Sequence, residues 1–251
     1  MSINSSIKRL FFGKKSAQAF FRKIFDLSIE GMNIGTGGGE ISRTGEAFVI
    51  RHCLGGVKDP VVFDVGAQGG DYSREVISVA GEAPVFAFEP SSRDFAKLKE
   101  ILGDKIKLQQ VALSDTVGRV TLYANGANGL SSLYQVGTET NGGQKEEVVT
   151  DTIDNFCQKQ NISKIDLLKL DVEGHELACL KGAHRMLPKI KNIQFEMSSR
   201  SRDAGTYFKD IFDYLADYRI YRILKDGLFE IESPDKLSEL LFTTNYLAKR
   251  K

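Results

Sequence analysis

The chain has 251 residues and a formal charge of +1, because 34 lysines and arginines stand against 33 aspartates and glutamates. Hydrophobic residues make up 41% of it and charged residues 27%, a balance that excludes disordered and collagen-like chains. It contains no apolar run of about 18 residues, which argues against a membrane-spanning protein. The length favours one α/β domain with a short extension over two full domains.

The three cysteines, Cys53, Cys157 and Cys179, lie far apart and form no C-x-x-C pair. This spacing predicts neither a disulfide framework nor a zinc site. We therefore expect a cytoplasmic protein with reduced thiols. Nucleic acid is not an expected partner, because the net charge is near zero and no basic stripe with stacking aromatics runs through residues 60–251.

The first 25 residues contain no acidic side chain, but they hold six basic residues and five phenylalanines. This pattern predicts a basic amphipathic helical arm, which lacks the apolar core of a secretory signal yet also resembles an organellar transit peptide. We expect residues 6–28 to pack on the main domain or on a second copy in a homodimer, with contact to a membrane surface as the alternative. The basic residues and phenylalanines are Lys8, Arg9, Lys14, Lys15, Arg22, Lys23, Phe11, Phe12, Phe20, Phe21 and Phe25.

Five glycines fall between Gly31 and Gly39, where few apolar residues compensate for the entropy of ordering them. We interpret this stretch as a mobile linker. A phosphate-cradling loop is the alternative, but no strand is predicted before it. The expected organisation is thus an arm and linker over residues 1–59 and a main domain over residues 60–251.

Strands and helices are predicted to alternate from residue 60 onward. An apolar run over 60–65 stops at Gly66, and a similar run over 84–89 follows a helix expected at 71–79. This alternation predicts right-handed crossovers and a doubly wound, mostly parallel α/β sheet of seven strands, Rossmann-like, with helices on both faces. The other predicted strands of the sheet cover 107–114, 165–170, 192–196, 219–224 and 241–248, with a supplementary strand at 119–123, and the other helices cover 92–102, 175–187 and 208–215.

Acidic residues follow or end five of the predicted strands, at the sheet edge where such folds bind ligands. Each acid could instead cap the helix that follows it. The turn after the first strand is rich in glycine, and Glu89 comes 25 residues after Asp64, where a carboxylate can accept both hydroxyls of a ribose. The turn does not match G-x-G-x-x-G, and clustered acids repel phosphates but suit a sulfonium cation, so we expect S-adenosylmethionine in preference to NAD. The five acids are Asp64, Glu89, Asp115, Asp171 and Glu196.

Four segments occur in a fixed order: FDVGAQGGDY at 63–72, VFAFEP at 85–90, VALSDTVG at 111–118 and DLLKLDVEGHELACLKG at 166–182. Together they resemble the FkbM family of S-adenosylmethionine-dependent methyltransferases over about residues 60–248. The most distinctive segment is DVEGHE at 171–176. Where the family usually has asparagine in the first turn, this chain has Gln68.

The resemblance implies O-methylation of a hydroxyl on a sugar, glycan or natural-product-type small molecule. It implies that Gly66 and Gly70 shape the site of the methionine end and that Glu89 holds the ribose. Ser114 and Asp115 would face the adenine edge, and Asp171 would lie nearest the sulfonium. The full set of implied cofactor-binding residues is Asp64, Gly66, Ala67, Gln68, Gly70, Tyr72, Glu89, Pro90, Ser114, Asp115 and Asp171.

An alcohol attacks a methyl group only if its proton is removed, so a base or a metal ion is expected near Asp171. The candidates are Asp171, Glu173, His175 and Glu196, and we favour a base such as Glu173 or His175. No metal is predicted, although Asp171 and Glu196 would share a divalent cation if one is used. For Glu176, a charge complementing the helix N-terminus is the simpler interpretation.

The acceptor pocket is expected to involve the arm, residues 125–145 and residues 198–202, where Arg200 and Arg202 would meet an anionic acceptor. Two other functions stay open at this point. One is a non-catalytic nucleoside-binding module that acts through its basic arm, and the other is a metal-dependent O-methyltransferase with a different acceptor class.

Overall fold

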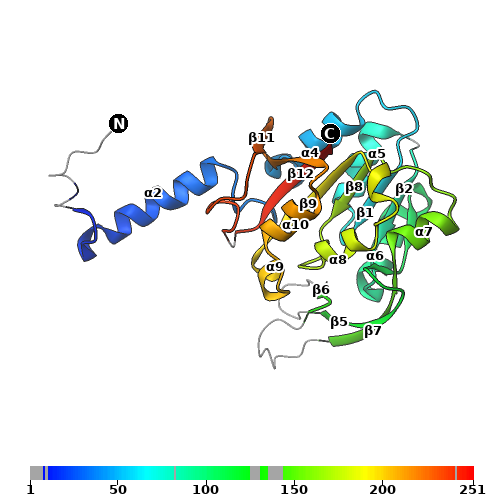
Figure 1. Ribbon diagram of the computed structural model, residues 1–251. Coiled ribbons are helices and arrows are strands. Elements are labelled where there is room, and N and C mark those ends of the chain that lie inside the picture. The colour runs from blue at the N-terminus through cyan, green and yellow to red at the C-terminus, as the bar shows by residue number, and fades with distance from the viewer. Residues whose placement is uncertain (1–7, 9–10, 82, 125–130, 135–143, 241) are drawn as a thin grey trace.

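The computed structural model describes residue 8 and residues 11–81, 83–124, 131–134, 144–240 and 242–251 (Figure 1). Its main sheet has eight strands in the order β11-β10-β12-β9-β8-β1-β2-β3. The predicted doubly wound α/β fold is confirmed, although the sheet is mixed: β9, β8, β1, β2 and β3 are parallel, and β12, β10 and β11 follow in antiparallel pairs. The bounds are β1 Val62–Val65, β2 Val85–Phe88, β3 Lys107–Gln109, β8 Leu167–Leu170, β9 Asn192–Met197, β10 Tyr218–Ile223, β11 Leu228–Ile231 and β12 Thr244–Arg250.

The prediction of seven strands missed β11, which forms a hairpin with β10 at the sheet edge. Its two central side chains, Phe229 and Glu230, are exposed, so the strand has no continuous apolar run to indicate it.

Helices cover both faces of this sheet, because successive side chains of a strand point to opposite sides. Phe63 and Leu168 face α7, α8 and α10, while Val62 and Leu167 face α4, α5 and α6. Figure 1 shows these layers around the central strands. The bounds are α4 Glu46–Leu54, α5 Asp71–Ala80, α6 Ser92–Leu102, α7 Ile153–Lys159, α8 Glu176–Lys181 and α10 Phe208–Tyr214, with the short α3 Ile41–Thr44 and α9 Ser199–Asp203 beside them.

A second sheet of four strands has the order β4-β7-β5-β6. The strand predicted over 107–114 is in fact divided, since β3 joins the main sheet and β4 pairs with β7 in the second one. The sequence analysis did not predict β7, because three consecutive charged residues at 145–147 leave no apolar pattern in its first half. The bounds are β4 Ala112–Leu113, β5 Gly118–Ala124, β6 Ser131–Ser132 and β7 Gln144–Asp151.

Helix α4, which lies before the predicted division at residue 59, packs into the core beside the main sheet. Val49 and Ile50 are fully buried against the main sheet. The predicted linker is also ordered: the Gly37 amide donates to the Thr243 carbonyl oxygen at 2.9 Å. A Cβ on Gly37 would lie 2.9 Å from Glu196 Oε1 and 2.8 Å from Thr243 Cγ2, so a side chain there would displace its neighbours.

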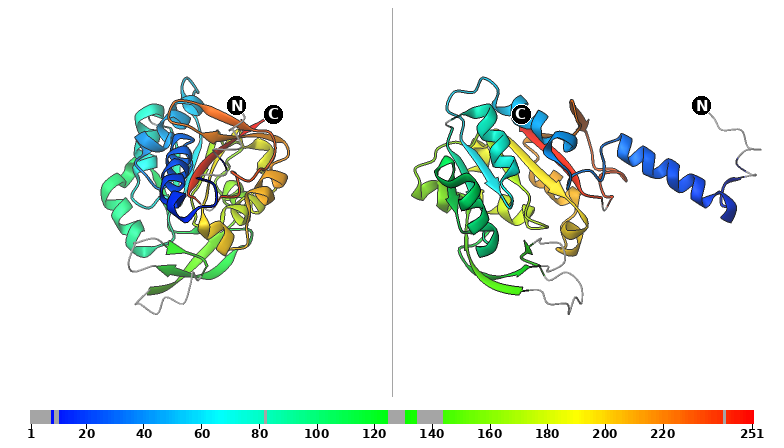
Figure 2. Two further views of the ribbon diagram at one scale, coloured as in Figure 1. Left: turned by 90° about the vertical axis from the view of Figure 1, so that its left-hand side faces the viewer. Right: turned by 180° about the vertical axis from the view of Figure 1, so that it is seen from behind.

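The predicted helical arm is present as α2, Gln18–Gly31, which projects away from the domain in Figure 1 and in the right-hand view of Figure 2. Ile29 is the buried residue of α2, and the Phe25 ring lies 6.2 Å from that of Phe242. Within the described residues, no helix combines the length and hydropathy needed to cross a bilayer.

Candidate active site

Two cavities open at the carboxyl ends of the parallel strands. The larger, of about 960 Å³, is lined by Asp171, Glu173 and Glu196, by the turn after β1 and by the segment around Gly37. The smaller is lined by Glu89, Pro90 and His175 and by the facing strands β4 and β6. Gly66, Gln68 and Asp171 line both cavities. The two cavities therefore adjoin at Asp171.

The turn after β1 packs directly against the end of β8. Gly66 has φ +81°, and a Cβ there would lie only 1.9 Å from the carbonyl oxygen of Asp171, so glycine is required. Gln68 has φ +39°, a conformation in which asparagine is the more common residue. The hydrogen bond from this residue to Glu89 Oε2, at 3.0 Å, does not depend on its side chain, because the donor is the main-chain amide of Gln68.

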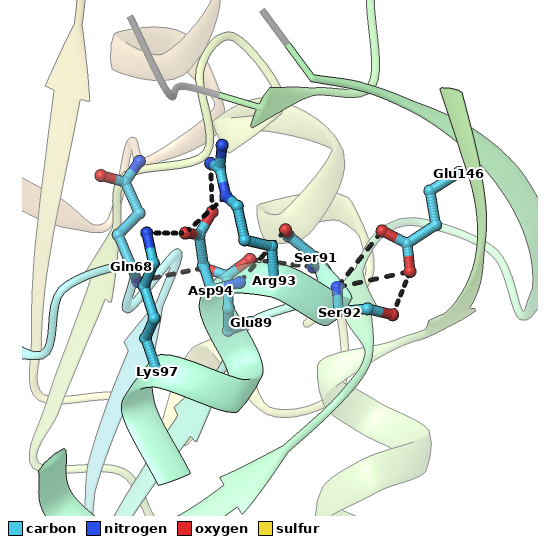
Figure 3. Close-up of polar contacts among 8 residues, drawn as sticks. All are labelled: Gln68, Glu89, Ser91, Ser92, Arg93, Asp94, Lys97 and Glu146. Carbon is cyan, nitrogen blue, oxygen red and sulfur yellow. Dashed lines mark hydrogen bonds and ion pairs between the residues drawn. The ribbon is translucent and has the colours of Figure 1, made fainter. Parts of the chain in front are cut away.

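Glu89 follows β2, and backbone amides hold both of its carboxylate oxygens (Figure 3). Besides the Gln68 amide, the Ser91 amide donates to Oε1 at 2.9 Å. Burial raises the pKa of Glu89 to about 7, although these two hydrogen bonds oppose the rise. Neighbouring Asp94 lines the same cavity and pairs with Arg93 and Lys97. The predicted ribose-binding carboxylate is thus fixed on the wall of the smaller cavity.

His175 also lines the smaller cavity, where two hydroxyl groups hold its ring. Tyr134 Oη lies 3.0 Å from Nδ1, and Ser114 Oγ lies 2.9 Å from Nε2. Burial lowers the pKa of His175, while Asp115 opposes this change. Ser114 and Asp115 are not part of the cavity wall, so the pair predicted to face adenine reaches the cavity only through His175. Val111 and Leu133 form the wall instead.

Lys169 is the buried cation beneath the larger cavity, and the sequence analysis did not select it. Its Nζ lies 3.3 Å from Asp171 Oδ2 and 3.5 Å from Asp64 Oδ1, and it sits 5.0 Å from the centre of the Tyr72 ring. Burial would lower the pKa of Lys169, but the charges of Asp64, Asp171 and Glu46 raise it above its ordinary value. A lysine inside the apolar run Leu167–Leu170 was the available signal.

Asp64 lies under the site, whereas Tyr72 lines the larger cavity. Asp64 lines neither cavity, and its Oδ2 accepts a hydrogen bond from Ser73 Oγ at 2.7 Å. Tyr72 Oη donates to Gln194 Oε1 at 3.0 Å, and Gln194 Nε2 donates to Glu46 Oε1 at 2.7 Å. Through Glu46, α4 therefore contributes to the site, which the predicted domain division had excluded.

Glu196 and Glu173 face the larger cavity with different partners. Burial raises the pKa of Glu196 well above its usual range, and the neighbouring Asp171 and Glu173 raise it further. Glu173 has its Oε2 3.3 Å from Arg200 Nε, which opposes the rise that burial causes in the pKa of Glu173. Of the predicted catalytic residues, the structure brings Asp171, Glu173 and Glu196 together in this cavity and places His175 in the other.

Glu176 lies beneath the turn that carries these carboxylates. Its Oε1 accepts hydrogen bonds from the amides of Val172 and Gly174, each at 3.2 Å, and burial raises its pKa to about 8. It lines neither cavity, which agrees with a capping role at the start of α8. The described residues include no cluster of three His, Cys, Asp or Glu side chains that could hold a metal ion.

Cationic side chains surround the mouth of the larger cavity. Arg51 pairs with Glu75 and Arg74 with Asp71, while the exposed Lys225 forms no ion pair with a described residue. Arg202 pairs with Asp203 and is not part of the lining. Of the predicted acceptor segment 125–145, residues 125–130 and 135–143 lie outside the described residues.

The doubly wound sheet, the glycine turn and the carboxylate after β2 define an enzyme that uses a nucleoside cofactor. The family model of the methyltransferase FkbM domain matches residues 64–222. The chain therefore belongs to the FkbM methyltransferase family, and the predicted resemblance is confirmed.

Two curated relatives extend this match. The 2-O-methyltransferase NoeI of Sinorhizobium fredii is 26% identical over 178 residues, 64% of this chain and 73% of the relative. The hexuronic acid methyltransferase AglP of Haloferax volcanii is 30% identical over 183 residues, 70% of each chain. Among solved structures, a precorrin-6y C5,15-methyltransferase of Geobacter metallireducens aligns with a TM-score of 0.45 and 12% identity, over 87% of this chain and 98% of that one.

Proposed function

We propose that the protein transfers a methyl group from S-adenosylmethionine to a hydroxyl of a sugar. The observation that carries the proposal is the position of Asp171, which lines both the cavity that holds Glu89 and the cavity that holds Glu196. The names of the relatives, a 2-O-methyltransferase and a hexuronic acid methyltransferase, support the reaction and the acceptor class.

The smaller cavity offers what an adenosyl group requires. Glu89 presents a fixed carboxylate to which two ribose hydroxyls can donate. Ser131 Oγ is buried in the same wall and hydrogen-bonds to none of the described residues, which leaves it free to bond an adenine nitrogen. The amino-acid end would follow the Gly66–Gly70 turn into the larger cavity, and the carboxylate of Asp171 would lie beside the sulfonium charge.

S-adenosylmethionine supplies an electrophilic methyl group whose sulfur leaves as a neutral thioether. The acceptor oxygen forms the new C–O bond as the C–S bond breaks, so a side chain must take the hydroxyl proton. We assign this role to Glu196, which lines the acceptor cavity and whose pKa is raised by burial and by the acids beside it. Glu173 is neutralised by Arg200, and hydroxyl groups hold His175 in the other cavity.

A sugar acid is an acceptor that suits the mouth of the larger cavity. Lys225 lines this mouth without an ion pair to any described residue, so it can bind a carboxylate of the acceptor. A cytoplasmic location agrees with three free, buried cysteines, of which Cys53 and Cys157 have pKa values that burial raises to about 12.

Calorimetric titration tests the cofactor assignment. Glu89→Ala removes two charge-assisted hydrogen bonds of roughly 1.5–3 kcal/mol each, so the Kd for S-adenosylmethionine should rise by at least about 100-fold. Glu146→Ala is the matched control, because Glu146 bonds only Ser92 in the same region (Figure 3). Failure of the intact protein to bind the cofactor, or tighter binding of NAD, would overturn the assignment.

Methyl transfer from labelled cofactor to a panel of neutral sugars and hexuronic acids tests the reaction. The proposal expects turnover that resists EDTA and requires Glu196. Cofactor binding without turnover on any sugar would instead support a binding module. Inactivation by EDTA that magnesium reverses would show that a metal activates the acceptor.

A further inference from the structure

The projecting arm carries an apolar face that no described part of the chain covers. Phe20, Ile24 and Leu27 are spaced by four and three residues, which places them on one face of α2. Their exposed fractions are 60%, 44% and 71%. An exposed row of large apolar side chains on an isolated helix is typical of a surface that binds a partner or a membrane.

Positive charge accompanies this face at the far end of the arm. Lys8, Lys14, Lys15, Arg22 and Lys23 are all exposed, and none lies within ion-pair distance of an acidic group among the described residues. The exposed rings of Phe11 and Phe12 lie in the same stretch. The Phe12 ring packs edge-on against Phe21 at 5.1 Å, which holds the turn before α2 against the helix.

The acidic residues of the arm lie only at its other end. Asp26 and Glu30 occupy the half of α2 that leads into the domain. The arm therefore presents a cationic outer half beside an apolar face. This combination complements a surface that is both negatively charged and apolar beneath its charged layer.

We infer that the arm binds an anionic membrane surface, with α2 lying in the interface. Phe20, Ile24 and Leu27 enter the boundary between headgroups and acyl chains, while the lysines and arginines contact lipid phosphates. A second copy of the chain fits the arm less well. Pairing two arms would bring ten of these cations together, whereas each arm supplies only two carboxylates.

Vesicle flotation of the full-length protein tests this inference, which does not depend on the proposed reaction. The protein should float with vesicles of phosphatidylcholine and phosphatidylglycerol, should not float with phosphatidylcholine alone, and should be released as salt is raised. Lys14→Gln with Lys15→Gln should lower the partition coefficient by roughly 25-fold, since each cation contributes about fivefold. Phe20→Ser with Leu27→Ser should lower it by at least about tenfold.

Matched substitutions on the main domain serve as controls. Lys58→Gln with Lys105→Gln removes the same charge, and Val117→Ser removes an exposed apolar side chain, so neither should change flotation. Circular dichroism would verify that every variant remains folded. Absence of flotation, equal binding to neutral vesicles, or unchanged binding of the arm variants would overturn the inference. A dimer in solution that Phe20→Ser with Leu27→Ser dissociates would also overturn it, and would identify a second copy as the occupant.

Discussion

Glu89 and Glu196 are both buried acids at the carboxyl ends of parallel strands, yet the protein holds them in opposite ways. Two backbone amides fix the carboxylate of Glu89. Glu196 accepts no hydrogen bond from any described residue, and burial and three acidic neighbours, Asp171, Glu173 and Glu176, raise its pKa. A carboxylate held by the backbone keeps one position and one role, as binding a ribose requires. A carboxylate surrounded by like charges changes its protonation state readily, as acid–base chemistry requires.

Lys169 separates these two environments. It is the one buried ammonium within the described part of the site, and it lies between Asp64 and Asp171, with Glu46 also within electrostatic reach. It keeps Asp171 compensated at the junction of the two cavities. For Glu196, Lys169 lowers the pKa less than burial and the neighbouring acids raise it.

The contrast between Glu89 and Glu196 fails if Glu196 is not the base. Glu196→Gln preserves size but cannot accept a proton, so kcat should fall by about 10²- to 10⁴-fold with cofactor affinity unchanged. Steady-state kinetics combined with calorimetric titration measures both quantities. The wild-type rate should also fall as the pH is lowered, because protonated Glu196 cannot accept the hydroxyl proton.

Asp171→Asn cannot serve as the control here, since it would abolish turnover whether a base or a metal activates the acceptor. Glu147→Gln provides one, because Glu147 is an exposed residue that pairs only with Arg119. If the Glu196→Gln enzyme has a normal kcat, Glu173 becomes the candidate for the base.

The role of Lys169 as the shared counter-charge is tested by stability. Lys169→Met leaves Asp64 buried without its cation, so the free energy of unfolding should fall by about 3–5 kcal/mol. Denaturant titration measures this change. Lys181→Met, which removes an exposed lysine from α8, should change it by less than about 0.5 kcal/mol. A Lys169→Met protein as stable as this control would show that the neighbouring carboxyls do not need the lysine.

The fixed carboxylate of Glu89 predicts a pH dependence of binding. Its pKa of about 7 means that the ionised form, which accepts the ribose hydroxyls, dominates above pH 7 and is lost below it. Affinity for S-adenosylmethionine should therefore fall by up to about tenfold per pH unit below 7 and level off above it. The stability of the cofactor-free protein has the opposite pH dependence. Because the pKa of Glu89 is higher in the folded than in the unfolded protein, this group stabilises the fold at pH values below its unfolded pKa, and the stabilisation is lost as the pH rises through 7.

Calorimetric titration with S-adenosylmethionine from pH 5.5 to 8.5 tests this pH dependence of the affinity, with Glu89→Gln as the comparison. The variant should bind weakly at every pH, because its amide does not titrate. A wild-type affinity that is flat across this range would mean that the ionisation of Glu89 is not linked to binding.

The strands that carry the site were predictable because their signals are local. The apolar run 60–65 ends in Gly66, and the run before Glu89 repeats the pattern, so both strands, the glycine turn and the position of Glu89 at a strand end could be predicted. The strand predicted at 107–114 was only half right. Nothing in that run of sequence shows that Ala112 leaves the main sheet to pair with Thr150, which lies 38 residues away.

His175 shows how far local reasoning reaches. The sequence places it two residues after Glu173, which made it a candidate for the same cavity. The chain turns between them, with φ +54° at Glu173 and +100° at Gly174, and His175 emerges toward Ser114 in the other cavity. Glu173 and His175, two residues apart in the turn that follows β8, thus lie in different halves of the site.

The sequence by itself determined the class of fold, the glycine turn after the first strand, the position of Glu89 and the acidic character of the strand ends, because each depends on residues close together in the chain. Only the tertiary structure decided that Lys169 lies between Asp64 and Asp171, that Gly37 closes over Glu196, and that α4 belongs to the core. These features join segments far apart in sequence. Their energies depend on burial and on distances between charges, and both exist only once the chain has packed.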